Sequence, residues 1–279
     1  MGNRDLVCGK FHLPLGGRTL IMGILNVTPD SFSDGGSFAS PRRAVARALH
    51  LQHEGADLID IGGESTRPGA RLVSARDEMR RILPVIETLF SKLSIPISVD
   101  TSKAPVAEAA LNAGASIVND VTGLRDPRMA GVVSRAGAPV ILMHMRGTPR
   151  TMRRFTRYRS LVRDVLFELC ASIRKARSAG IRRDRILTDP GFGFAKTPEQ
   201  SFTLLRNLGA LRQLGYPVVI GPSRKSFLGA AAGWPPEERL FGTAAAVALG
   251  IAAGADVVRV HDVGAMRQVA SIADAVARS

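Results

Sequence analysis

The chain has little cysteine, few aromatic residues and no long hydrophobic run. Its two cysteines, Cys8 and Cys170, form no CxxC pair, which argues against a disulfide framework or a zinc site and favours reduced thiols. No apolar run approaches about 20 residues, so we expect no membrane-spanning helix. The amino terminus lacks the apolar segment of a secretory signal, and Leu6 stands where an acylation signal needs Ser or Thr. These absences predict a cytoplasmic protein.

What the chain does contain is ordinary for a large globular core. It has 279 residues, of which 45% are hydrophobic and 22% charged. Barrels of alternating strands and helices reach about 250 residues as one unit, so this length does not require a division. We therefore expect residues 1–279 to form a single domain.

The net charge of +14 is the unusual feature of the composition. Many of the arginines lie in 146–163 (RGTPRTMRRFTRYRSLVR) and in 174–185. A basic surface attracts anions in general, including nucleic acid. The chain shows no basic tail and few aromatic residues to stack on bases, so solvated helix and loop faces are the favoured interpretation. A nucleic-acid-binding module stays a minor alternative, and the first of these stretches has no functional explanation from the sequence.

Strand-like and helical segments alternate along the whole chain. After a short amino-terminal extension that resembles a small hairpin, eight strands are expected at 20–25, 57–61, 97–99, 116–118, 140–143, 186–188, 218–220 and 257–260. Helices are expected between and after them at 40–54, 74–90, 105–112, 127–136, 158–179, 198–208, 225–230, 242–253 and 262–277. Pro41 should lie in the first turn of the first helix, and Pro84 should kink the second. This alternation predicts an α/β fold, a single (β/α)₈ TIM barrel; a doubly wound sheet is the runner-up, but no Gly-rich phosphate turn follows the first strand.

The segment 242–253 (GTAAAVALGIAA) is apolar on nearly all sides. A helix without a polar face is buried against another surface, and a second copy of the chain is one candidate. We therefore expect a homodimer.

Polar residues follow almost every predicted strand. In a barrel the carboxyl ends of all strands open onto one face, so these scattered residues should converge on one pocket. They are Asn26, Glu64 to Arg67, Asp100, Asn119 with Asp120, His144, Asp189, Ser223 to Lys225, and Arg259 with His261. Each could instead serve as a helix cap, a turn former or a solvated side chain, and His144 between two methionines reads better as a buried histidine with satisfied hydrogen bonds than as a ligand.

The residue types suggest what such a pocket would bind. Asp100, Asn119 and Asp189 offer the donors and acceptors that fit a planar heterocycle with amino, ring NH and keto groups. Cationic side chains with the Thr66 hydroxyl suit an anion; they are Lys225, Arg67, Arg259 and His261. Asn26 could give an oxygen to a Mg²⁺ ion that arrives with a pyrophosphate, because Mg²⁺ keeps most of its waters.

Eight segments together resemble the dihydropteroate synthase family, the sulfonamide-inhibited enzymes of folate biosynthesis. They are GILNVTPDSFSDGG (23–36), DIGGESTRPGA (60–70), SVDT (98–101), VNDVTG (118–123), LMHMRGTP (142–149), DPGFGFAKT (189–197), PSRKSFLG (222–229) and RVHDV (259–263). The resemblance runs over nearly the whole chain, and the combination of segments is highly specific. It implies a transferase that joins 6-hydroxymethyl-7,8-dihydropterin pyrophosphate to p-aminobenzoate.

The resemblance also implies roles for individual residues. The ring of the pterin would be held by Asp100, Asn119, Val121, Met143, Asp189 and Lys225. Pyrophosphate would bind at Asn26, Thr66, Arg67, Arg259 and His261, with Asn26 also on Mg²⁺. The aminobenzoate would contact Phe32, Pro68, Phe194 and Ser226. The residues implied in the reaction itself are Asp34, which would face the reacting methylene, Arg67 and Lys225.

Two departures from the family's pattern are visible. Ala195 stands where the family usually has Gly, and Pro222 where it often has a small or β-branched residue, both beside the aminobenzoate side. The resemblance therefore implies the enzymatic activity more strongly than it implies inhibition by sulfonamides. A methyltetrahydrofolate–corrinoid methyltransferase, which shares the pterin-binding barrel, is the alternative enzyme; it needs neither the cationic cluster nor the TPDSF loop, and both are present here.

Overall fold

The computed structural model describes residues 4–28, 36–67, 69–231 and 233–278, without the side chains of 4 and 36–40. Three residues singled out from the sequence, namely Phe32, Asp34 and Pro68, lie outside the described residues.

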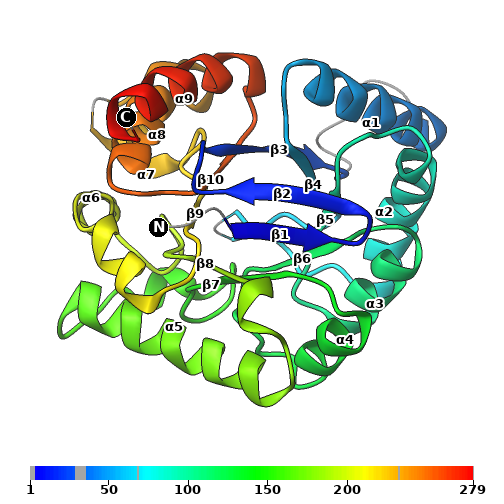
Figure 1. The fold of residues 1–279 in the computed structure, drawn as a ribbon, viewed down its shortest axis with the longest axis horizontal. Helices are drawn as coiled ribbons and strands as arrows, with labels where there is room; N and C mark the ends of the chain where they lie inside the picture. The colour runs from blue at the N-terminus through cyan, green and yellow to red at the C-terminus, as the bar shows by residue number, and fades with distance from the viewer. Residues whose placement is uncertain (1–3, 29–35, 68, 232, 279) are drawn as a thin grey trace.

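Eight parallel strands form the centre of the described chain (Figure 1). They are β3 (Leu20–Asn26), β4 (Leu58–Gly62), β5 (Ile97–Asp100), β6 (Ile117–Asp120), β7 (Val140–Met143), β8 (Ile186–Asp189), β9 (Val219–Ile220) and β10 (Val257–Val260). Their order is β8-β7-β6-β5-β4-β3-β10-β9, and a parallel bridge between Thr188 and Val218 joins the two outer strands. The sheet therefore closes into the predicted (β/α)₈ barrel, and the doubly wound alternative is excluded.

Helices surround the barrel, as Figure 1 shows. They are α1 (Gly36–His53), α2 (Ala75–Phe90), α3 (Ala104–Asn112), α4 (Met129–Ala136), α5 (Leu161–Ser178), α6 (Pro198–Arg206), α7 (Ser226–Ala230), α8 (Leu240–Ala252) and α9 (Val263–Ala277). Local sequence explains several of their ends. Ser74 caps α2 by accepting from the Asp77 amide, Thr197 and Gln200 form a capping box on α6, and Gly137 ends α4 in a left-handed conformation.

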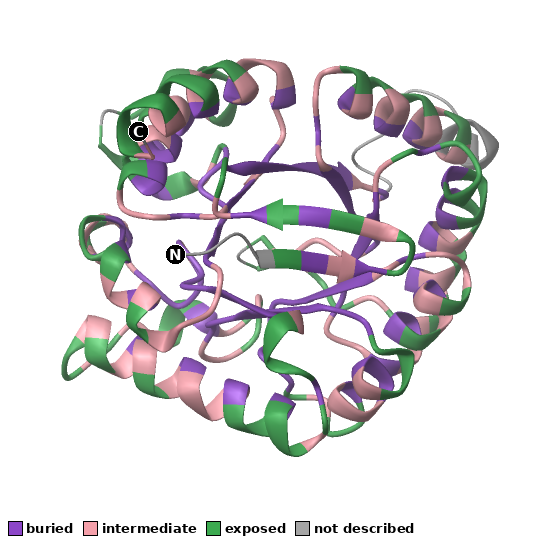
Figure 2. Ribbon diagram, viewed as in Figure 1, coloured by how far each residue is buried: buried purple, intermediate pink, exposed green. Residues whose placement is uncertain are grey.

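The barrel strands are buried on both faces, as the purple ribbons at the centre of Figure 2 show. The hairpin predicted at the amino terminus is present, with β1 (Arg4–Cys8) antiparallel to β2 (Phe11–Leu15). Its buried residues, including Leu6, Leu13 and Leu15, pack on the first residues of the barrel strands, such as Leu20 and Leu58. The hairpin thus closes the amino-terminal end of the barrel, which leaves the carboxyl end as the open one.

Two expectations about where helices begin need correction. The first helix begins at Gly36 rather than near residue 40, so Pro41 lies inside it instead of in its first turn. The fifth begins at Leu161 and not at Tyr158, whose hydroxyl bonds the Ala195 carbonyl. The second includes Pro84 within a single helix, as expected, and the kink there stays a prediction. The ends of a helix are predicted from a sequence less accurately than its existence, because tertiary contacts help to decide where the helix begins.

Two further observations bear on the sequence analysis. Cys8, the last residue of β1, is buried between the hairpin and the barrel, and burial raises the pKa of its thiol to about 12, so it stays protonated and inert. Within the described ranges, no helix combines the length and the apolar character needed to cross a bilayer.

Candidate active site

The carboxyl ends of the strands bring the predicted polar residues to one end of the barrel. Asp100 on β5 lies in register beside Asn119 on β6, and Met143 on β7 lies beside Asp189 on β8. Asp100, Asn119 and Asp189 are all buried, with at most 7% of each residue exposed. Burying a carboxylate costs free energy when its oxygens lack partners. Two buried carboxylates at the open end of the barrel therefore indicate a site that binds a ligand.

Asp60 on β4 belongs to this site although the sequence analysis did not select it. Its carboxylate is fully buried, and its Oδ2 accepts a hydrogen bond of 3.1 Å from Asn119 Nδ2. A carboxylate can only accept hydrogen bonds, so the Asn119 side chain turns its NH₂ group toward Asp60. The amide oxygen of Asn119 is then available to accept a hydrogen bond from another group. The signal that could have found Asp60 is a single acid within the otherwise apolar strand Leu58–Gly62.

Arg259 on β10 reaches into the same group of acids. Its Nε lies 2.6 Å from Asp60 Oδ2, and its Nη2 lies 2.7 Å from Asp100 Oδ2. The other oxygens of both carboxylates, Asp60 Oδ1 and Asp100 Oδ1, are buried and have no hydrogen-bond partner. We call the group of Asp60, Asp100 and Asp189 the acidic floor of the site. The Arg259 cation is already bound to this floor, and buried carboxylate oxygens remain free to accept hydrogen bonds from a further donor.

The charged groups at this end of the barrel change one another's pKa values. Burial raises the pKa of Asp100 to about 7, with Arg259 opposing and Asp60 adding to the rise. Burial also raises the pKa of Asp189, against the effect of Lys225. Desolvation lowers the pKa of Lys225 to about 8, and Asp189 is the main opposing influence. Groups whose protonation changes near neutral pH are typical of ligand and catalytic sites.

Lys225 stands between the acids and the turn that follows β8. Its Nζ donates a hydrogen bond of 2.7 Å to the Phe192 carbonyl and lies 4.4 Å from the centre of the Phe194 ring. The Phe194 side chain belongs to a small apolar cluster with Val121, Met143, Met145, Met152 and Ala195. The predicted ring-binding residues Val121 and Met143 and the predicted aminobenzoate residue Phe194 thus share one apolar wall beside the charged floor.

The predicted anion-binding residues lie on neighbouring strand ends and loops. Ser223 contacts His261 twice: the His261 backbone amide donates a hydrogen bond of 3.2 Å to Ser223 Oγ, and Ser223 Oγ lies 2.9 Å from His261 Nδ1. Burial lowers the pKa of His261 to about 4, with Arg259, Arg224 and Arg67 also lowering it. The imidazole is therefore neutral, and its Nδ1 is occupied by Ser223 Oγ.

Other predicted residues occupy the rim. Asn26 is half-buried at the end of β3, Thr66 is half-buried and Arg67 exposed in the loop after β4, and Ser226 is exposed as the first residue of α7. One of the cationic residues that follow the strands, Arg224, is paired with an acid outside this group. Arg224 pairs with Asp262, at 2.9 Å from its Nε, and thus braces the loop after β9 against the start of α9.

His144 is buried with both ring nitrogens occupied, as its flanking methionines suggested. Its Nδ1 lies 2.8 Å from Lys196 Nζ and its Nε2 lies 3.0 Å from Glu168 Oε2. Lys196 is a buried lysine that the sequence analysis did not select, because only the fold brings it to His144.

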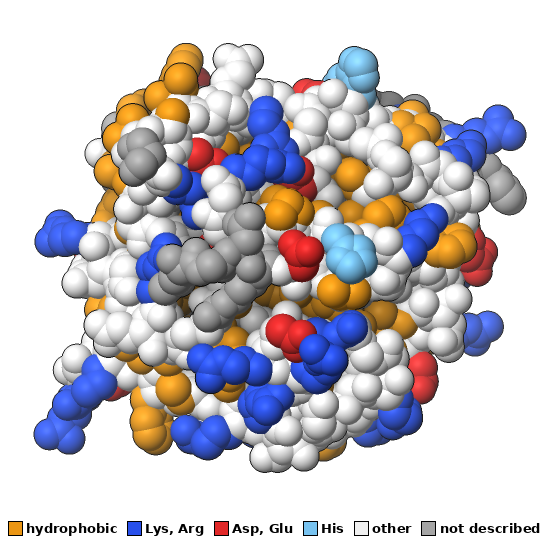
Figure 3. All heavy atoms as spheres, viewed as in Figure 1, with side chains coloured by type: hydrophobic (Ala, Val, Ile, Leu, Met, Phe, Trp, Pro, Cys, Tyr) orange, Lys and Arg blue, Asp and Glu red, His pale blue; other side chains and the backbone are white. Residues whose placement is uncertain are grey.

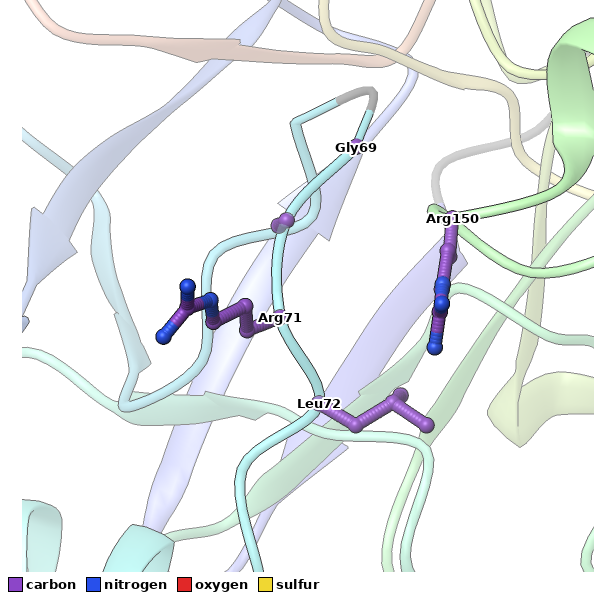
Figure 4. A pocket seen from close by; sticks show the side chains of 5 residues that line it. Gly69, Arg71, Leu72 and Arg150 are labelled. Atoms are coloured by element: carbon purple, nitrogen blue, oxygen red, sulfur yellow. The ribbon is translucent and has the colours of Figure 1, made fainter.

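A cavity of about 510 Å³ lies at the mouth, between the loop after β4 and the loop after β7 (Figure 4). It is lined by Gly69, Ala70, Arg71, Leu72 and Arg150. The amide of Gly69 donates to the Pro149 carbonyl at 3.1 Å, which ties the two loops together. The basic stretch 146–163 therefore contributes at least Arg150 to the entrance of the barrel.

No group of three or more histidine, cysteine, aspartate or glutamate side chains in the described part of the chain is arranged to hold a metal ion. His50 and His53 lie in the last turn of α1, away from the strand ends. The arrangement is thus a polar and charged cup whose floor accepts hydrogen bonds, with neutral His261 and the Arg67 cation toward its rim.

Comparison with known proteins agrees with this geometry. Residues 22–261 match the family described as pterin binding enzyme. The dihydropteroate synthase of Synechocystis sp. is 50% identical over 98% of this chain and 95% of its own length. The structure of the Xanthomonas albilineans dihydropteroate synthase with 4-aminobenzoic acid superposes with a TM-score of 0.93 at 45% identity, covering 99% of this chain and 98% of the other.

A second structure of the Xanthomonas albilineans enzyme, in complex with 7,8-dihydropteroate, has a TM-score of 0.89 at 43% identity and covers 98% of both chains. The agreement extends over almost the full length of each relative, at an identity that leaves no doubt about common ancestry. The chain therefore belongs to the dihydropteroate synthase family of pterin-binding transferases.

Proposed function

We propose that this chain condenses 6-hydroxymethyl-7,8-dihydropterin pyrophosphate with p-aminobenzoate to give 7,8-dihydropteroate and pyrophosphate, in folate biosynthesis. The observation that carries the proposal is the acidic floor, in which Asp100 keeps an unpaired buried oxygen beside Asn119 while Lys225 faces Asp189. The amino and NH edge of a pterin supplies the donors that such acceptors lack.

Each ring-binding residue has a distinct part. Asp100 and Asp189 accept from the guanidine-like edge, the Asn119 oxygen accepts from a ring NH, and Lys225 donates to a ring acceptor. Val121 and Met143 provide the apolar contact for the face of the ring, which the shared cluster supports. Arg259 balances the charge of Asp60 and Asp100 beneath the ring.

The pyrophosphate is proposed to lie nearer the mouth. Neutral His261 offers its Nε2 hydrogen, because Ser223 occupies Nδ1. Arg67 supplies positive charge at the rim, Arg259 is proposed to add its charge from its place between Asp60 and Asp100, and the Thr66 hydroxyl and the Asn26 amide supply uncharged hydrogen bonds.

Mg²⁺ is proposed as the cofactor, carried by the pyrophosphate. The only metal ligand proposed on the protein is the Asn26 oxygen, and this donor fits an ion that keeps its waters and phosphate oxygens better than a resident metal site. When bound, the ion would neutralise charge on the leaving oxygen.

The reaction is proposed to follow an S_N1-like route. The bond between the methylene carbon and the pyrophosphate oxygen breaks, and the electron pair leaves with the pyrophosphate toward Arg67 and His261. The aniline nitrogen then forms the new C–N bond and loses one proton to solvent. The chain contributes preorganised charges, including Lys225 and Asp34 facing the methylene; such groups are worth several kcal/mol each in other enzymes.

The aminobenzoate is proposed to bind over Phe194 and beside Ser226, with Phe32 and Pro68 completing the site. Phe194 is held in the apolar wall next to Lys225, and Ser226 is exposed at the start of α7, where backbone amides attract a carboxylate.

The chain is also proposed to act as a homodimer of single-domain subunits in the cytoplasm. The outer face of α8 exposes Phe241 (84%) and Leu249 (61%), and α9 exposes Ile272 (71%) and Val276 (76%). These residues are spaced along two helices that pack on each other, and hydrophobic atoms gather at that edge in Figure 3. A patch of this kind on a soluble protein is typical of an interface. Replacing Phe241 and Leu249 by Asp should convert a dimer to a monomer in light scattering; an unchanged mass would refute this surface.

The function is tested by incubating the purified chain with the pterin pyrophosphate and Mg²⁺, with and without aminobenzoate. Pyrophosphate release that depends on aminobenzoate, together with dihydropteroate in the product, is the expected result. Methyl transfer from a methylated folate to a corrinoid without any condensation would favour the methyltransferase alternative instead.

A further inference from the structure

The turn Gly191–Lys196, which follows β8, is held in an uncommon conformation. Gly191, Gly193 and Ala195 all have positive φ, at 67°, 74° and 52°. A Cβ on Gly191 would lie 2.2 Å from the His144 carbonyl oxygen, so the turn is pressed directly against the end of β7. Ala195 has a Cβ and therefore adopts this conformation at an energetic cost that glycine does not have. Such a conformation persists only where the surroundings hold it.

Lys196 holds the turn from behind. Its Nζ lies 2.9 Å from the Phe194 carbonyl oxygen and 2.8 Å from His144 Nδ1, and the side chain is buried. The direction of the second bond follows from the partners of His144. The pKa of Glu168 is lowered to about 2, through hydrogen bonds from His144 and Arg146 that outweigh burial, so Glu168 accepts from His144 Nε2.

Burial lowers the pKa of His144 to about 4, so the ring is neutral at physiological pH and its Nδ1 can only accept. Lys196 therefore donates both to the ring and to the backbone of the turn. These bonds link the turn through His144 to Glu168 on α5.

Tyr158 holds the same turn from the side. Its hydroxyl donates to the Ala195 carbonyl at 3.0 Å, and its ring lies 4.0 Å from the Arg146 guanidinium carbon. Arg146 in turn pairs with Glu168 at 2.5 Å. Lys196 and Tyr158 thus reach one framework, and together they occupy the carbonyls of Phe194 and Ala195.

The front of the turn faces the proposed reaction site. Lys225 binds the Phe192 carbonyl and lies over the Phe194 ring, as described above. The turn therefore places Phe194 relative to Lys225 with no support from the substrate. A shift of about 1 Å in a group that positions a substrate can cost two orders of magnitude in rate.

We propose that Lys196 is a positioning residue of the aminobenzoate side: by binding the Phe194 carbonyl and His144 it fixes the turn that presents Phe194 to the second substrate. Tyr158 supports the same turn through the Ala195 carbonyl. Lys196 itself touches neither substrate. This inference rests on the proposed function, because it assigns a role within the aminobenzoate site.

The test compares Lys196→Met and Tyr158→Phe with Arg278→Met in steady-state kinetics, varying each substrate while the other is saturating. Arg278 is the matched control: it binds Asp274, Thr19 and the carbonyls of Gly16 and Ala255 at the amino-terminal end of the barrel. Thermal unfolding of each variant is measured in parallel.

Lys196→Met should raise the KM for aminobenzoate roughly tenfold, the equivalent of about 1.4 kcal/mol, because one to two net hydrogen bonds are lost. Tyr158→Phe, which removes one bond, should raise it roughly threefold. The KM for the pterin pyrophosphate should change several times less in both, and Arg278→Met should lower the unfolding temperature without separating the two KM values. If Lys196→Met does not fold, Tyr158→Phe decides the question by the same criterion.

Equal changes in both KM values, or an unchanged KM for aminobenzoate in a folded variant, would overturn the role of Lys196 while the activity of the unsubstituted chain still supports the proposed function. Absence of dihydropteroate with the unsubstituted chain would refute the proposed function, and this inference with it.

Discussion

Aspartates at the two ends of the barrel have opposite surroundings. At the amino-terminal end, both Asp57 oxygens are occupied: Arg18 donates to each, at 2.6 and 2.9 Å, and the Ile21 amide and Arg267 donate to Oδ2. At the carboxyl end, Asp100 receives one bond from Arg259 and keeps a buried oxygen without a partner.

The same residue type therefore titrates in opposite directions. Burial alone raises the pKa of Asp57, but the bonds from Arg18, the Ile21 amide and Arg267 outweigh it and the pKa ends below its usual value. Burial raises the pKa of Asp100 to about 7, and Arg259 compensates only in part. The amino-terminal end is arranged for stability and the carboxyl end for a ligand, as is general in this fold.

The largest effect is expected at the carboxyl end. Lys225→Ala should lower kcat/KM by roughly a thousandfold, because a half-buried positive charge at the proposed reaction site is lost. The unfolding temperature of this variant should stay the same or rise, because removing the Lys225 ammonium group from water already costs free energy in the folded state. Lys92→Ala, at an exposed lysine, is the control. Near-normal turnover of Lys225→Ala would remove this residue from the site.

The amino-terminal end should show the reverse response. Asp57→Asn should lower the free energy of unfolding by about 3 kcal/mol, because it breaks a half-buried network of two arginines, and should leave kcat within about twofold. The folded pKa of Asp57 is depressed, so its contribution is present above the unfolded pKa near 4 and is lost as the pH falls through the folded value.

Urea unfolding at pH 7 and at pH 3 measures this difference, which should shrink in acid. Asp100→Asn is the counterpart at the open end, and we expect it to abolish activity with a much smaller loss of stability. Equal losses of stability in the two variants would contradict the contrast between the ends.

The affinity for a pterin ring should depend on pH in both directions. Asp100 must be ionised to accept from the ring and titrates at about 7, while Lys225 must be protonated and titrates at about 8. Affinity for 6-hydroxymethylpterin should therefore be greatest between these values and fall by up to about tenfold per pH unit on either side. Calorimetric titration from pH 5.5 to 9.5 checks this profile.

Arg259→Gln sharpens the same measurement. Arg259 is the main influence that lowers the pKa of Asp100, so its loss should move the acid limb of the profile to higher pH. An acid limb that does not move would show that another group governs it.

The smallest effects concern two left-handed residues, one at each end. Ala195→Gly should raise the free energy of unfolding by up to about 1 kcal/mol, because a glycine tolerates φ of 52°. Gly137→Ala, at the end of α4, should lower it by about 1 kcal/mol, since its Cβ would make only an ordinary contact, 4.0 Å from Arg185 Nη1, while its φ of 60° is unfavourable. Denaturant unfolding measures both, and the same sign in both variants would contradict the assignment of strain to Ala195.

Much of the fold could be predicted from the sequence because its signals are local. Apolar strands of two to seven residues alternate with helices, whose ends are marked by glycines such as Gly137 and by caps such as Ser74 and Thr197. Since parallel strands in a barrel share one open end, the polar residues that follow them could be assigned to one site before their geometry was known.

The remainder of the site depends on contacts that no local pattern encodes. Arg259 reaches Asp60 across 199 positions and Lys196 reaches His144 across 52, so their pairing follows only from the closed barrel. Ala195 was recognised as a departure from the family's pattern, but its cost became clear only with its φ value. Asp60 was overlooked because it lies within a strand rather than after one.

The most direct test of the central claim is a crystal structure of this chain with 6-hydroxymethylpterin bound. The account predicts the ring at the carboxyl end of the barrel, with Asp100, Asn119, Asp189 and Lys225 each within about 3.2 Å of a ring nitrogen, oxygen or amino group. A ring bound elsewhere, or one that leaves two or more of these side chains without contact, would contradict it.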